Sequence, residues 1–320
     1  MLIVRLDGGL GNQMFQYAFA KKLESKGYEV GIDISWYADK KNTNPTIANF
    51  AQNQHATIRN LEISHYNLSL PLLSDFNPYD FFILHDRFYV LRNKINRFLP
   101  RPLRMKNYKF FIPDDVKLCK IIQENKPYFP DYAYFSGFYQ NLSCIVEPQD
   151  ISGDFSLKNP LSQANQALKE QIASFQDSVF LHIRRGDYLA FERYIHLTER
   201  YYNQALYMMK TKKDSFHVFV FSNDIQWCKE YFIKQLDNTL MQNLTFEFIG
   251  NNDEGNAIID MELMRTCKHG IIANSTFSWW AAYLLKSKDK IIIAPSRFLQ
   301  DSTIERMKLL YPQEWTLIEV

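Results

Sequence analysis

Short apolar runs alternate with amphipathic stretches through the second half of the chain. The apolar runs predict strands at 179–183, 217–221, 245–249, 270–273 and 290–294. Apolar residues at helical spacing predict helices near 161–175, 198–213, 224–236, 254–267 and 277–286. This alternation predicts a doubly wound parallel sheet, in which ligands bind beyond the carboxyl ends of the strands. Polar residues that directly follow a strand are therefore the candidates for a functional site.

The first half of the chain has a clear pattern only at its beginning. Residues 2–6 form a β-prone run, 7–12 form a glycine-rich turn before a helix, and 29–34 form a second strand. This βαβ unit implies a parallel strand pair with a right-handed crossover. From about 38 to 130 the periodicity is poor, which predicts irregular or helical insertions. With a linker expected between 150 and 160, the sequence predicts an N-terminal domain at 1–155 and a C-terminal domain at 156–320.

The composition describes a globular protein. The chain has 320 residues, 46% of them hydrophobic, and 37 Lys and Arg balance 35 Asp and Glu. A net charge of +2 argues against nucleic acid as the main partner. Because Arg5 and Asp7 lie where a signal peptide would be apolar, and no long apolar run follows, we expect a cytoplasmic protein that spans no membrane.

Four cysteines are spread along the chain, at Cys119, Cys144, Cys228 and Cys267. They form no C-x-x-C pair, so they indicate neither a zinc site nor a disulfide framework. All four are expected to be reduced and to serve in packing.

A basic segment lies at 88–109, within the poorly patterned region. It has no acidic residue, and its basic residues are Arg92, Lys94, Arg97, Arg101, Arg104, Lys106 and Lys109. Because aromatic and aliphatic residues are interleaved with these charges, the segment fits peripheral contact with anionic lipid at the inner face of a membrane, or contact with an acidic acceptor. A solvated basic surface is the alternative interpretation, and charge runs favour it in general.

The first strand leads into a turn with the sequence GGLGNQMF, from Gly8. A dinucleotide-binding motif would need a third glycine where this chain has Met14, although Asp33 has the spacing of a ribose-binding acid. An NAD-dependent oxidoreductase is therefore an alternative, and a purely structural turn is another. Asn12 and Gln13 are uncharged hydrogen-bonding groups at the tip of this turn, where they could bind sugar hydroxyls.

Two polar motifs follow strands of the C-terminal half. HIRRGDY begins at His182, and side chains alternate along a strand, so only one of Arg184 and Arg185 needs to face a ligand while the other braces the fold. An arginine at this position can bind a pyrophosphate through its planar guanidinium group. FSND ends at Asp224, which either caps the next helix or holds a ribose or base.

The last motif, NSTFSWWAA, runs from a strand into a helix. At this junction free backbone amides, the hydroxyls of Ser275 and Thr276 and the positive end of the helix come together, which is typical of an anion site. Capping of the helix by Ser275 or Thr276 is the structural alternative.

Together the four motifs resemble those of the α-1,2-fucosyltransferases of glycosyltransferase family eleven, of the bacterial type. GGLGNQMFQYA, HIRRGDY, FSND and NSTFSWWAAYL occur in the family's order, and only the region from about 38 to 130 has no recognisable counterpart. The resemblance implies an α/β fold of the GT-B-like class, with two Rossmann-type domains whose parallel sheets face each other across a cleft. It further implies an acceptor side in the N-terminal domain and GDP-fucose binding in the C-terminal domain.

The resemblance also implies roles for individual residues. The residues expected at the reacting groups are Arg185, Arg184, Asp187 and Asn12, and those expected to hold the donor are Gly11, Gln13, His182, Asp224, Asn274, Ser275, Thr276 and Phe277. The implied activity is transfer of L-fucose to the 2-hydroxyl of a terminal galactose in a glycan, and a related fucosyltransferase with another linkage is an alternative. A glycan-binding protein without catalysis is a further alternative, suggested by 15% aromatic residues.

The implied reaction inverts the sugar configuration in one displacement. Negative charge then gathers on the departing GDP, and an arginine with a helix N-terminus can stabilise it without a metal ion. The two adjacent acidic pairs, 114–115 and 253–254, lie outside the motifs, so we expect metal independence and no cofactor. Asp187 and Glu192 are candidates for the base that deprotonates the acceptor, and the leaving phosphate itself is the alternative.

Overall fold

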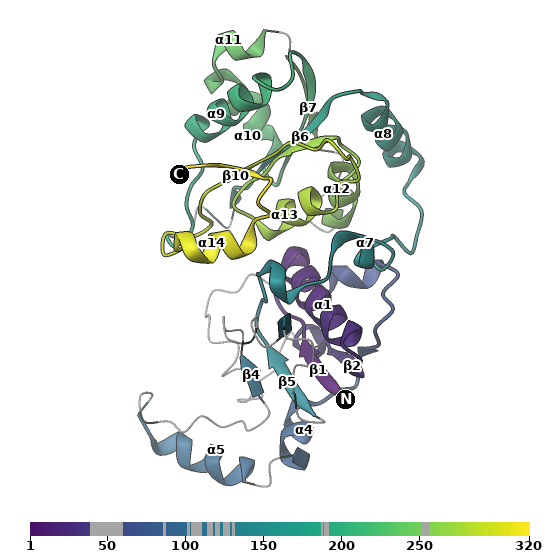
Figure 1. Ribbon diagram of the computed structural model, residues 1–320, viewed down its shortest axis with the longest axis vertical. Coiled ribbons are helices and arrows are strands. Elements are labelled where there is room, and N and C mark those ends of the chain that lie inside the picture. Colours follow the sequence, from purple (N-terminus) through teal and green to yellow (C-terminus); the bar gives the residue numbers. More distant parts are fainter. Residues whose placement is uncertain are drawn as a thin grey trace. The chain divides into compact units, whose positions relative to one another are not determined.

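The computed structural model describes most of the chain as two compact units. The described residues are 1–38, 60–85, 88–100, 103, 111–113, 118, 122–123, 129, 132–186, 188, 192–242, 244–250, 252 and 256–320. The units are Met1–Phe155 and Ser156–Val320, and each is built on its own parallel sheet (Figure 1).

Among its described residues the first unit has five short parallel strands with the order β3-β2-β1-β5-β4. Its strands are β1 (Leu2–Arg5), β2 (Val30–Asp33), β3 (Leu72–Leu73), β4 (Phe111–Pro113) and β5 (Ala133–Ser136). Its α-helices are α1 (Leu10–Ser25), α2 (Ser35–Ala38), α4 (Pro78–His85), α5 (Tyr89–Phe98) and α7 (Pro148–Ile151), with 3₁₀ turns η1 (Glu62–His65) and η3 (Leu142–Cys144). The βαβ unit predicted from the sequence is confirmed, because β1 and β2 pair in parallel.

The first unit is organised around α1. All four residues of β1 are buried, and α1 places Phe15 and Phe19 in the core beneath the sheet. The ring of Phe19 stacks on Tyr139 with 3.8 Å between ring centroids. The poorly patterned region, expected to hold insertions, contributes β3 and β4 at the two edges of this sheet as well as helices.

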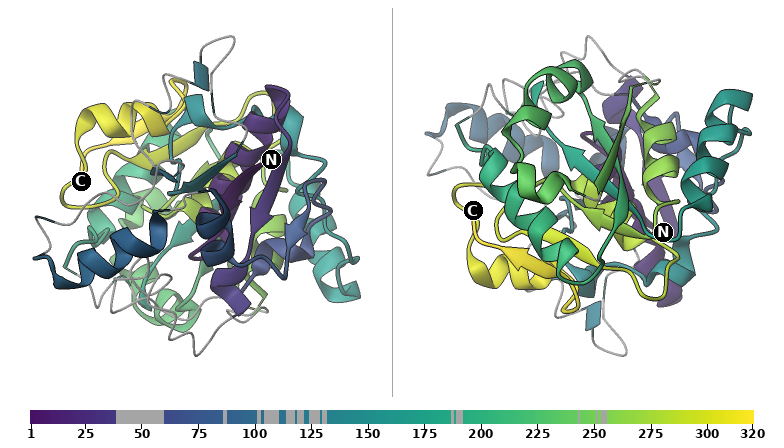
Figure 2. Two further views of the ribbon diagram at one scale, coloured as in Figure 1. Left: turned by 90° about the horizontal axis from the view of Figure 1, so that it is seen from below. Right: turned by 90° about the horizontal axis from the view of Figure 1, so that it is seen from above.

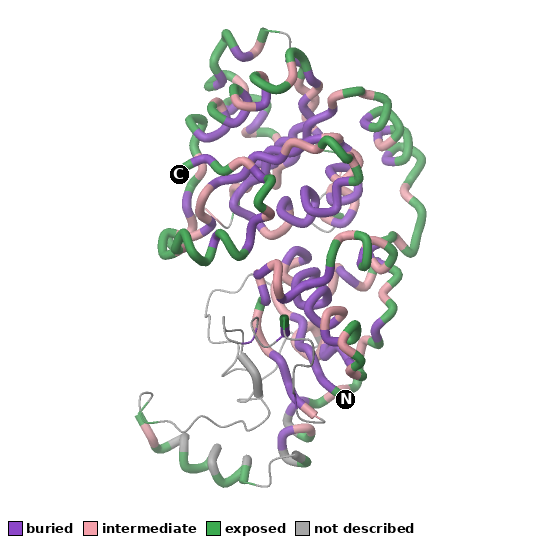
Figure 3. The backbone as a smooth tube through the Cα atoms, in the orientation of Figure 1, coloured by how far each residue is buried: buried purple, intermediate pink, exposed green. Residues whose placement is uncertain are grey.

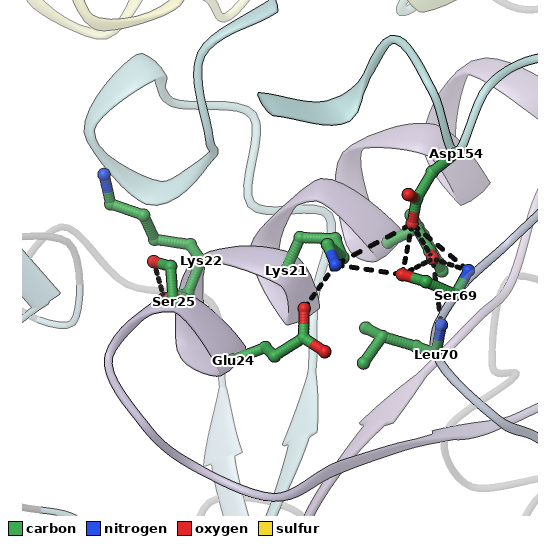
Figure 4. Close-up of polar contacts among 8 residues, drawn as sticks. Lys21, Lys22, Glu24, Ser25, Ser69, Leu70 and Asp154 are labelled. Atoms are coloured by element: carbon green, nitrogen blue, oxygen red, sulfur yellow. Dashed lines mark hydrogen bonds and ion pairs between the residues drawn. The ribbon is translucent and has the colours of Figure 1, made fainter. Parts of the chain in front are cut away.

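A polar cluster ties α1 to the end of the first unit (Figure 4). The Tyr17 hydroxyl accepts hydrogen bonds from the amides of Ser69 at 2.9 Å and Leu70 at 3.2 Å, and it donates to the carboxylate of Asp154. Lys21 Nζ lies 3.9 Å from the same carboxylate. Burial and the hydrogen bond to Asp154 raise the pKa of Tyr17, so the phenol keeps its proton. These contacts fix the chain just before the boundary between the units.

The second unit has six parallel strands with the order β11-β10-β9-β6-β7-β8. The strands are β6 (Ser178–Ile183), β7 (Phe216–Ser222), β8 (Leu244–Ile249), β9 (His269–Ile271), β10 (Ile292–Pro295) and β11 (Thr316–Ile318). The helices are α8 (Gln163–Ser174), α9 (Glu199–Lys210), α10 (Ile225–Glu230), α11 (Asn238–Met241), α12 (Ala257–Met264), α13 (Thr276–Tyr283) and α14 (Ile304–Leu310), with the 3₁₀ turn η5 (Phe232–Gln235). The five strands and five helical stretches predicted here are confirmed, and β11 is an addition.

Helices cover both faces of the six-stranded sheet (Figure 2). Leu181 and Ile183 of β6 pack in one apolar cluster with Tyr201 and Tyr202 of α9. His182, one position between them, points to the opposite face and lies against Phe277 of α13. Continuous burial of β6 follows from this double cover, and Figure 3 shows the buried positions running along the strands.

Helix α13 is deeply buried in the second unit. Trp279 and Trp280 have no exposed surface, and the ring of Trp279 stacks on Tyr283 with 4.6 Å between centroids. This packing holds the start of α13 in one position relative to the sheet.

The cysteines differ in part from the expectation of four reduced thiols. Cys228 and Cys267 are free and buried. Cys144 is disulfide-bonded, so the expectation is wrong for this residue. Disulfides are rare in reducing compartments, and the cytoplasmic location therefore stays a prediction.

Candidate active site

The strand order of the second unit gives its sheet a topological switch point at β6, the place where a crevice forms in open α/β sheets. The chain runs outward from β6 through β7 to β8, then returns to β9 on the other side of β6. The loops after β6 and β9 therefore diverge, and ligands bind at such a switch point. Leu181 of β6 pairs with Ile271 of β9, so HIRRGDY and NSTFSWWAA leave the sheet side by side.

Arg185 is held against α10. Its Nε lies 3.2 Å from Asp224 Oδ2, and its guanidinium carbon lies 3.6 Å from the centre of the Trp227 ring. Its backbone amide donates to Asn223 Oδ1 at 2.9 Å. The side chain is thus part of the packing between two strand ends. Of the two arginines, Arg185 is the one that braces the fold.

Arg184 directly follows the end of β6, and its side chain lines the same pocket as Arg185. Its guanidinium carbon lies 5.3 Å from the centre of the Tyr188 ring, which in turn stacks on Tyr194 at 3.9 Å. Its charge also acts on His182, whose pKa it lowers. Arg184 therefore lines the pocket and is near enough to His182 to influence its charge.

His182 is a buried polar side chain with one nitrogen unpaired among the described residues. It is 4% exposed, and its Nδ1 has no hydrogen-bond partner in the part of the chain that the structure describes. Burial, and then the charge of Arg184, lower its pKa to about 3, so the ring is neutral at physiological pH. An unsatisfied buried nitrogen costs folding free energy, of order 1–3 kcal/mol, unless a ligand completes it.

The start of α13 lies on the β9 side of this switch point. Ser275 caps the helix, because its Oγ accepts a hydrogen bond from the Phe277 amide at 3.3 Å. The capping interpretation is thereby confirmed. The remaining amides of the first turn and the positive end of the helix are compatible with an anion at the same place. Thr276 and Phe277 are partly exposed there.

Asn274 has a structural position. Its Nδ2 donates at 2.9 Å to the carbonyl oxygens of both Ile195 and Phe298, and the residue is 2% exposed. The side chain thus joins three loops beneath the crevice and offers no Nδ2 proton to a ligand.

Asp224 caps α10 and pairs with Arg185. Its Oδ1 accepts from the Trp227 amide at 3.2 Å, which confirms the capping interpretation. Gly186 has a φ of +60°, and a Cβ there would lie 2.5 Å from Asn223 Nδ2. This close approach explains why glycine follows the arginines. Asp187, the next residue, lies outside the described residues.

A small pocket adjoins the arginines. Its volume is about 190 Å³, below the ~300–1,000 Å³ typical of whole-ligand sites, so it suits one ring of a larger ligand. Arg184, Arg185, Trp227, His196 and Glu199 are among its lining residues.

The first unit also has a switch point, between β1 and β5. Gly8 follows β1 with a φ of +77°, and a Cβ there would lie 2.9 Å from Asn12 Nδ2. Asn12 Oδ1 accepts from Gln140 Nε2 at 3.1 Å, and both residues are partly exposed. Gly11 is buried within the first turn of α1.

Gln13 is a structural residue. It has no exposed surface, its Nε2 donates to the carbonyl oxygens of Gly8 at 3.0 Å and Asn60 at 2.8 Å, and its Oε1 accepts from the Ile63 amide at 2.9 Å. Both amide protons are therefore used within the first unit, and the expectation that Gln13 binds sugar hydroxyls does not fit this position.

Three polar residues at this edge, Asp7, Gln16 and Gln140, were not among the predicted site residues. Asp7 Oδ1 accepts from Gln16 Nε2 at 3.0 Å, and Gln16 Nε2 also donates to the Gly137 carbonyl at 3.1 Å. Burial raises the pKa of Asp7. Asp7 lies two residues after β1, so the rule for strand ends could have found it. Gln16 belongs to the GGLGNQMFQYA motif but has a helical position, and Gln140 lies in no motif.

Asp33 is unavailable to a dinucleotide. It has no exposed surface, and its carboxylate accepts from the Tyr134 hydroxyl at 2.6 Å and the Ser35 amide at 2.8 Å. A ribose-binding acid must reach a ligand. The residue that suggested an oxidoreductase is therefore a buried structural carboxylate.

Metal ligands and membrane-spanning helices are the remaining features to consider. Over the described ranges, no group of three or more His, Cys, Asp or Glu side chains is placed to hold a metal ion. Residues 114–115 and 253–254 are outside those ranges. No helix in the described part of the chain is both long and apolar enough to cross a bilayer.

The fold thus describes an α/β protein of two parallel-sheet units, with two arginines and the start of a helix at the strand ends of the second. The sequence matches the family model for glycosyl transferase family 11 over residues 1–319. The chain therefore belongs to this family and is a glycosyltransferase, and the oxidoreductase and non-catalytic alternatives are wrong.

Two bacterial relatives match over nearly the whole chain. The O-antigen biosynthesis glycosyltransferase WbnK of Escherichia coli is 31% identical over 95% of this chain and 97% of its own length. An alpha-1,2-colitosyltransferase of Escherichia coli is 29% identical over 100% of this chain and 99% of its own length. Galactoside alpha-(1,2)-fucosyltransferase 2 of Gorilla gorilla gorilla is 29% identical over 58% of this chain and 55% of its own.

A solved structure confirms the fold. The fucosyltransferase NodZ from Bradyrhizobium superposes with a TM-score of 0.50 at 16% identity, over 93% of this chain and 95% of that one. The GT-B-like class expected from the sequence is therefore confirmed.

Proposed function

We propose that the protein transfers L-fucose from GDP-fucose to the 2-hydroxyl of a terminal galactose, with inversion and without a metal ion. Membership of the family supports sugar transfer, and the name of the matching fucosyltransferase supports both the sugar and its acceptor. The observation that carries the proposal is the switch point between β6 and β9, where His182 lies against Phe277 of α13 and its Nδ1 has no hydrogen-bond partner among the described residues, with the charge of Arg184 acting on the ring.

The donor diphosphate is proposed to bind in this crevice. Arg184 supplies the positive charge, and the first turn of α13, with Thr276 and Phe277 beside it, supplies amides. His182 Nδ1 completes its hydrogen bonding on the nucleotide. Charge that develops on the leaving GDP is stabilised by these fixed groups, which need no reorganisation during the reaction.

Arg185 and Asp224 have a positioning role in this proposal. The pair holds α10 against the loop after β6, so that the Arg184 backbone keeps one conformation. Asn274 and Ser275 act in the same way on the start of α13. These residues support the donor pocket without contacting the reacting atoms.

The first unit is proposed to bind the acceptor. Asn12 and Gln140 present partly exposed amides at its switch point, and amides are suited to sugar hydroxyls because they donate and accept. Asp187 stays a prediction as a candidate base, and Glu192 is an exposed residue of the loop after β6.

A direct assay tests the proposal. The purified chain is incubated with GDP-fucose and lactose, with and without EDTA, and the product linkage is determined. An α-1,2-linked fucosyl product, formed equally in EDTA, is expected. A ligand at 100 times its Kd stabilises a protein by about 2.7 kcal/mol, so GDP should raise the melting temperature. If neither GDP nor guanosine raised it, the proposed diphosphate site would be overturned.

The full-length match to a colitosyltransferase raises a second candidate donor sugar. GDP-colitose and GDP-fucose would both place the same diphosphate in the crevice, so GDP binding cannot distinguish the two donors. Competition between GDP-fucose and GDP-colitose in one assay distinguishes them, because the natural donor has the higher kcat/KM.

A further inference from the structure

Helix α5 presents an apolar face that nothing in the described chain covers. Leu91, Ile95 and Phe98 are 55%, 42% and 87% exposed. Their spacing of four and three residues places them on one side of the helix. We call these three residues the α5 face. Seven of the fourteen large apolar side chains exposed in the described residues lie between 84 and 103: Leu84, Phe88, Val90, Leu91, Ile95, Phe98 and Leu103.

The preceding helix shows that this exposure is not a general property of the region. Phe82 of α4 is 2% exposed and packs with Ile3 and Tyr134 of the sheet. The rings of Phe82 and Tyr134 are 5.1 Å apart. In Figure 1, α5 lies farther from the sheet of the first unit than α4 does, and Figure 3 shows its described positions as mainly exposed. The apolar residues of α4 thus serve the core, whereas the α5 face does not.

The basic residues around the α5 face indicate the kind of surface that it would bind. The sequence from 88 to 109 has seven basic residues and no acidic one, and Lys94 is exposed between Leu91 and Ile95 along the helix. Lysine and arginine beside an apolar stripe are typical of helices that lie in a membrane interface, where the charges meet anionic headgroups. Two copies of this segment would repel each other, which argues against pairing of the chain with itself.

We propose that α5 is an interfacial anchor, which lies on a bilayer containing anionic lipid with the α5 face inserted between headgroups. At ten residues the helix is too short to span a bilayer, so it lies in the plane of the surface. This inference does not depend on the sugar that the enzyme transfers, because it concerns a surface remote in sequence from every motif residue.

Flotation of the full chain with lipid vesicles tests the anchor. The protein is expected to float with phosphatidylcholine vesicles that contain phosphatidylglycerol, to float far less with phosphatidylcholine alone, and to lose binding as NaCl is raised. Equal flotation with both vesicle types, or none with either, overturns the proposal.

Substitutions locate the contact. Leu91→Ser with Ile95→Ser removes apolar area without a change in charge and is expected to lower partitioning onto anionic vesicles by about 10-fold or more. Ile304→Ser with Leu309→Ser on α14 is the matched control, since both residues are also exposed, and should float like the wild type. Circular dichroism and the melting temperature check that both variants fold. Identical flotation of the two variants would contradict the proposal.

An acidic protein partner is the competing occupant. Binding of fluorescently labelled polyglutamate to the wild type, in the absence of lipid, is therefore measured by fluorescence anisotropy. Binding of polyglutamate that is lost in the Leu91→Ser, Ile95→Ser variant, combined with no flotation of the wild type, would assign the α5 face to a protein instead. Flotation that Lys94→Gln weakens, with no dependence of polyglutamate binding on Leu91 and Ile95, supports the membrane.

Discussion

The two units share one architecture and differ in what their strand ends leave available. Each has a parallel sheet with a switch point beside its first strand. In the first unit, Gln13 and Gln16 have hydrogen bonds to neighbouring backbone or side-chain atoms. In the second, buried His182 has no partner for Nδ1 within the described part of the unit, and the charge of Arg184 acts on its ring. The same topology thus leaves side-chain amides with their hydrogen bonds made in one unit, and an unpaired imidazole nitrogen near a positive charge in the other.

The strongest test of this contrast is Arg184→Ala. Loss of one preorganised donor to the leaving group is expected to lower kcat/KM by ~10²–10³, with an unchanged melting temperature. Steady-state kinetics with GDP-fucose measures the effect. Arg193→Ala is the matched control, because its ion pair with Asp301 lies on the surface with side chains 62% and 65% exposed, and activity should be unchanged. A normal rate for Arg184→Ala would remove this residue from the donor site.

Arg185→Ala separates the two arginines. Because this side chain packs on Trp227 and pairs with Asp224, the variant is expected to lose melting temperature as well as activity. If Arg185→Ala kept its stability and lost all transfer while Arg184→Ala stayed active, the assigned roles would be reversed.

In the first unit the large effect should fall on stability. Gln13→Leu leaves two carbonyls and one amide without their buried partner and is expected to cost about 2–4 kcal/mol of unfolding free energy. Urea denaturation measures it. Gln166→Leu on the exposed face of α8 is the control and should stay within about 0.5 kcal/mol of the wild type. A neutral Gln13→Leu would mean that the buried amide contributes nothing to the first unit.

Two buried histidines on neighbouring strands sharpen the comparison within the second unit. His269 has partners at both nitrogens, Asp177 at 3.2 Å and the Ile291 amide at 3.1 Å, whereas His182 Nδ1 has none among the described residues. His182→Leu is expected to gain about 1 kcal/mol of stability and to lose the melting shift induced by GDP, while His269→Leu should lose about 2 kcal/mol. Thermal denaturation with and without GDP checks both. Equal destabilisation by the two changes would show that His182 is satisfied in the free protein.

The smallest effect is a pH dependence at Asp260. Burial raises its pKa from 3.8 to about 6, against a hydrogen bond from Asn252 that lowers it. The folded state therefore keeps this proton between pH 3.8 and about 6 while the unfolded state loses it, so stability falls as pH rises through that window and is level above it. Asp260→Asn should be more stable than the wild type at pH 7, by at most about 3 kcal/mol, and the gain should vanish near pH 4. Urea midpoints at the two pH values measure the gain, and an equal gain at both would contradict the assignment.

In the second unit strand and helix positions were largely predictable, and residue roles were not. Strands such as β6 are buried on both faces, so their apolar runs are continuous and visible in the sequence. β11 escaped prediction because Thr316–Ile318 is too short to show a period. The pair Arg184 and Arg185 could be named as a site, but the division of roles between them depends on Trp227 and Asp224, which another strand supplies. Gln13 and Asn274 look like ligand-binding amides until their partners, far away in the sequence, are known.

By itself the sequence determined the family, the two parallel sheets and the four motifs that follow strands, because each depends on residues that are neighbours along the chain. Only the tertiary structure decided which motif side chains are already satisfied, which imidazole is left without a partner and which helix leaves its apolar face outside the core. Hydrogen bonding and burial depend on groups that folding brings together from distant positions, and local patterns carry no record of them.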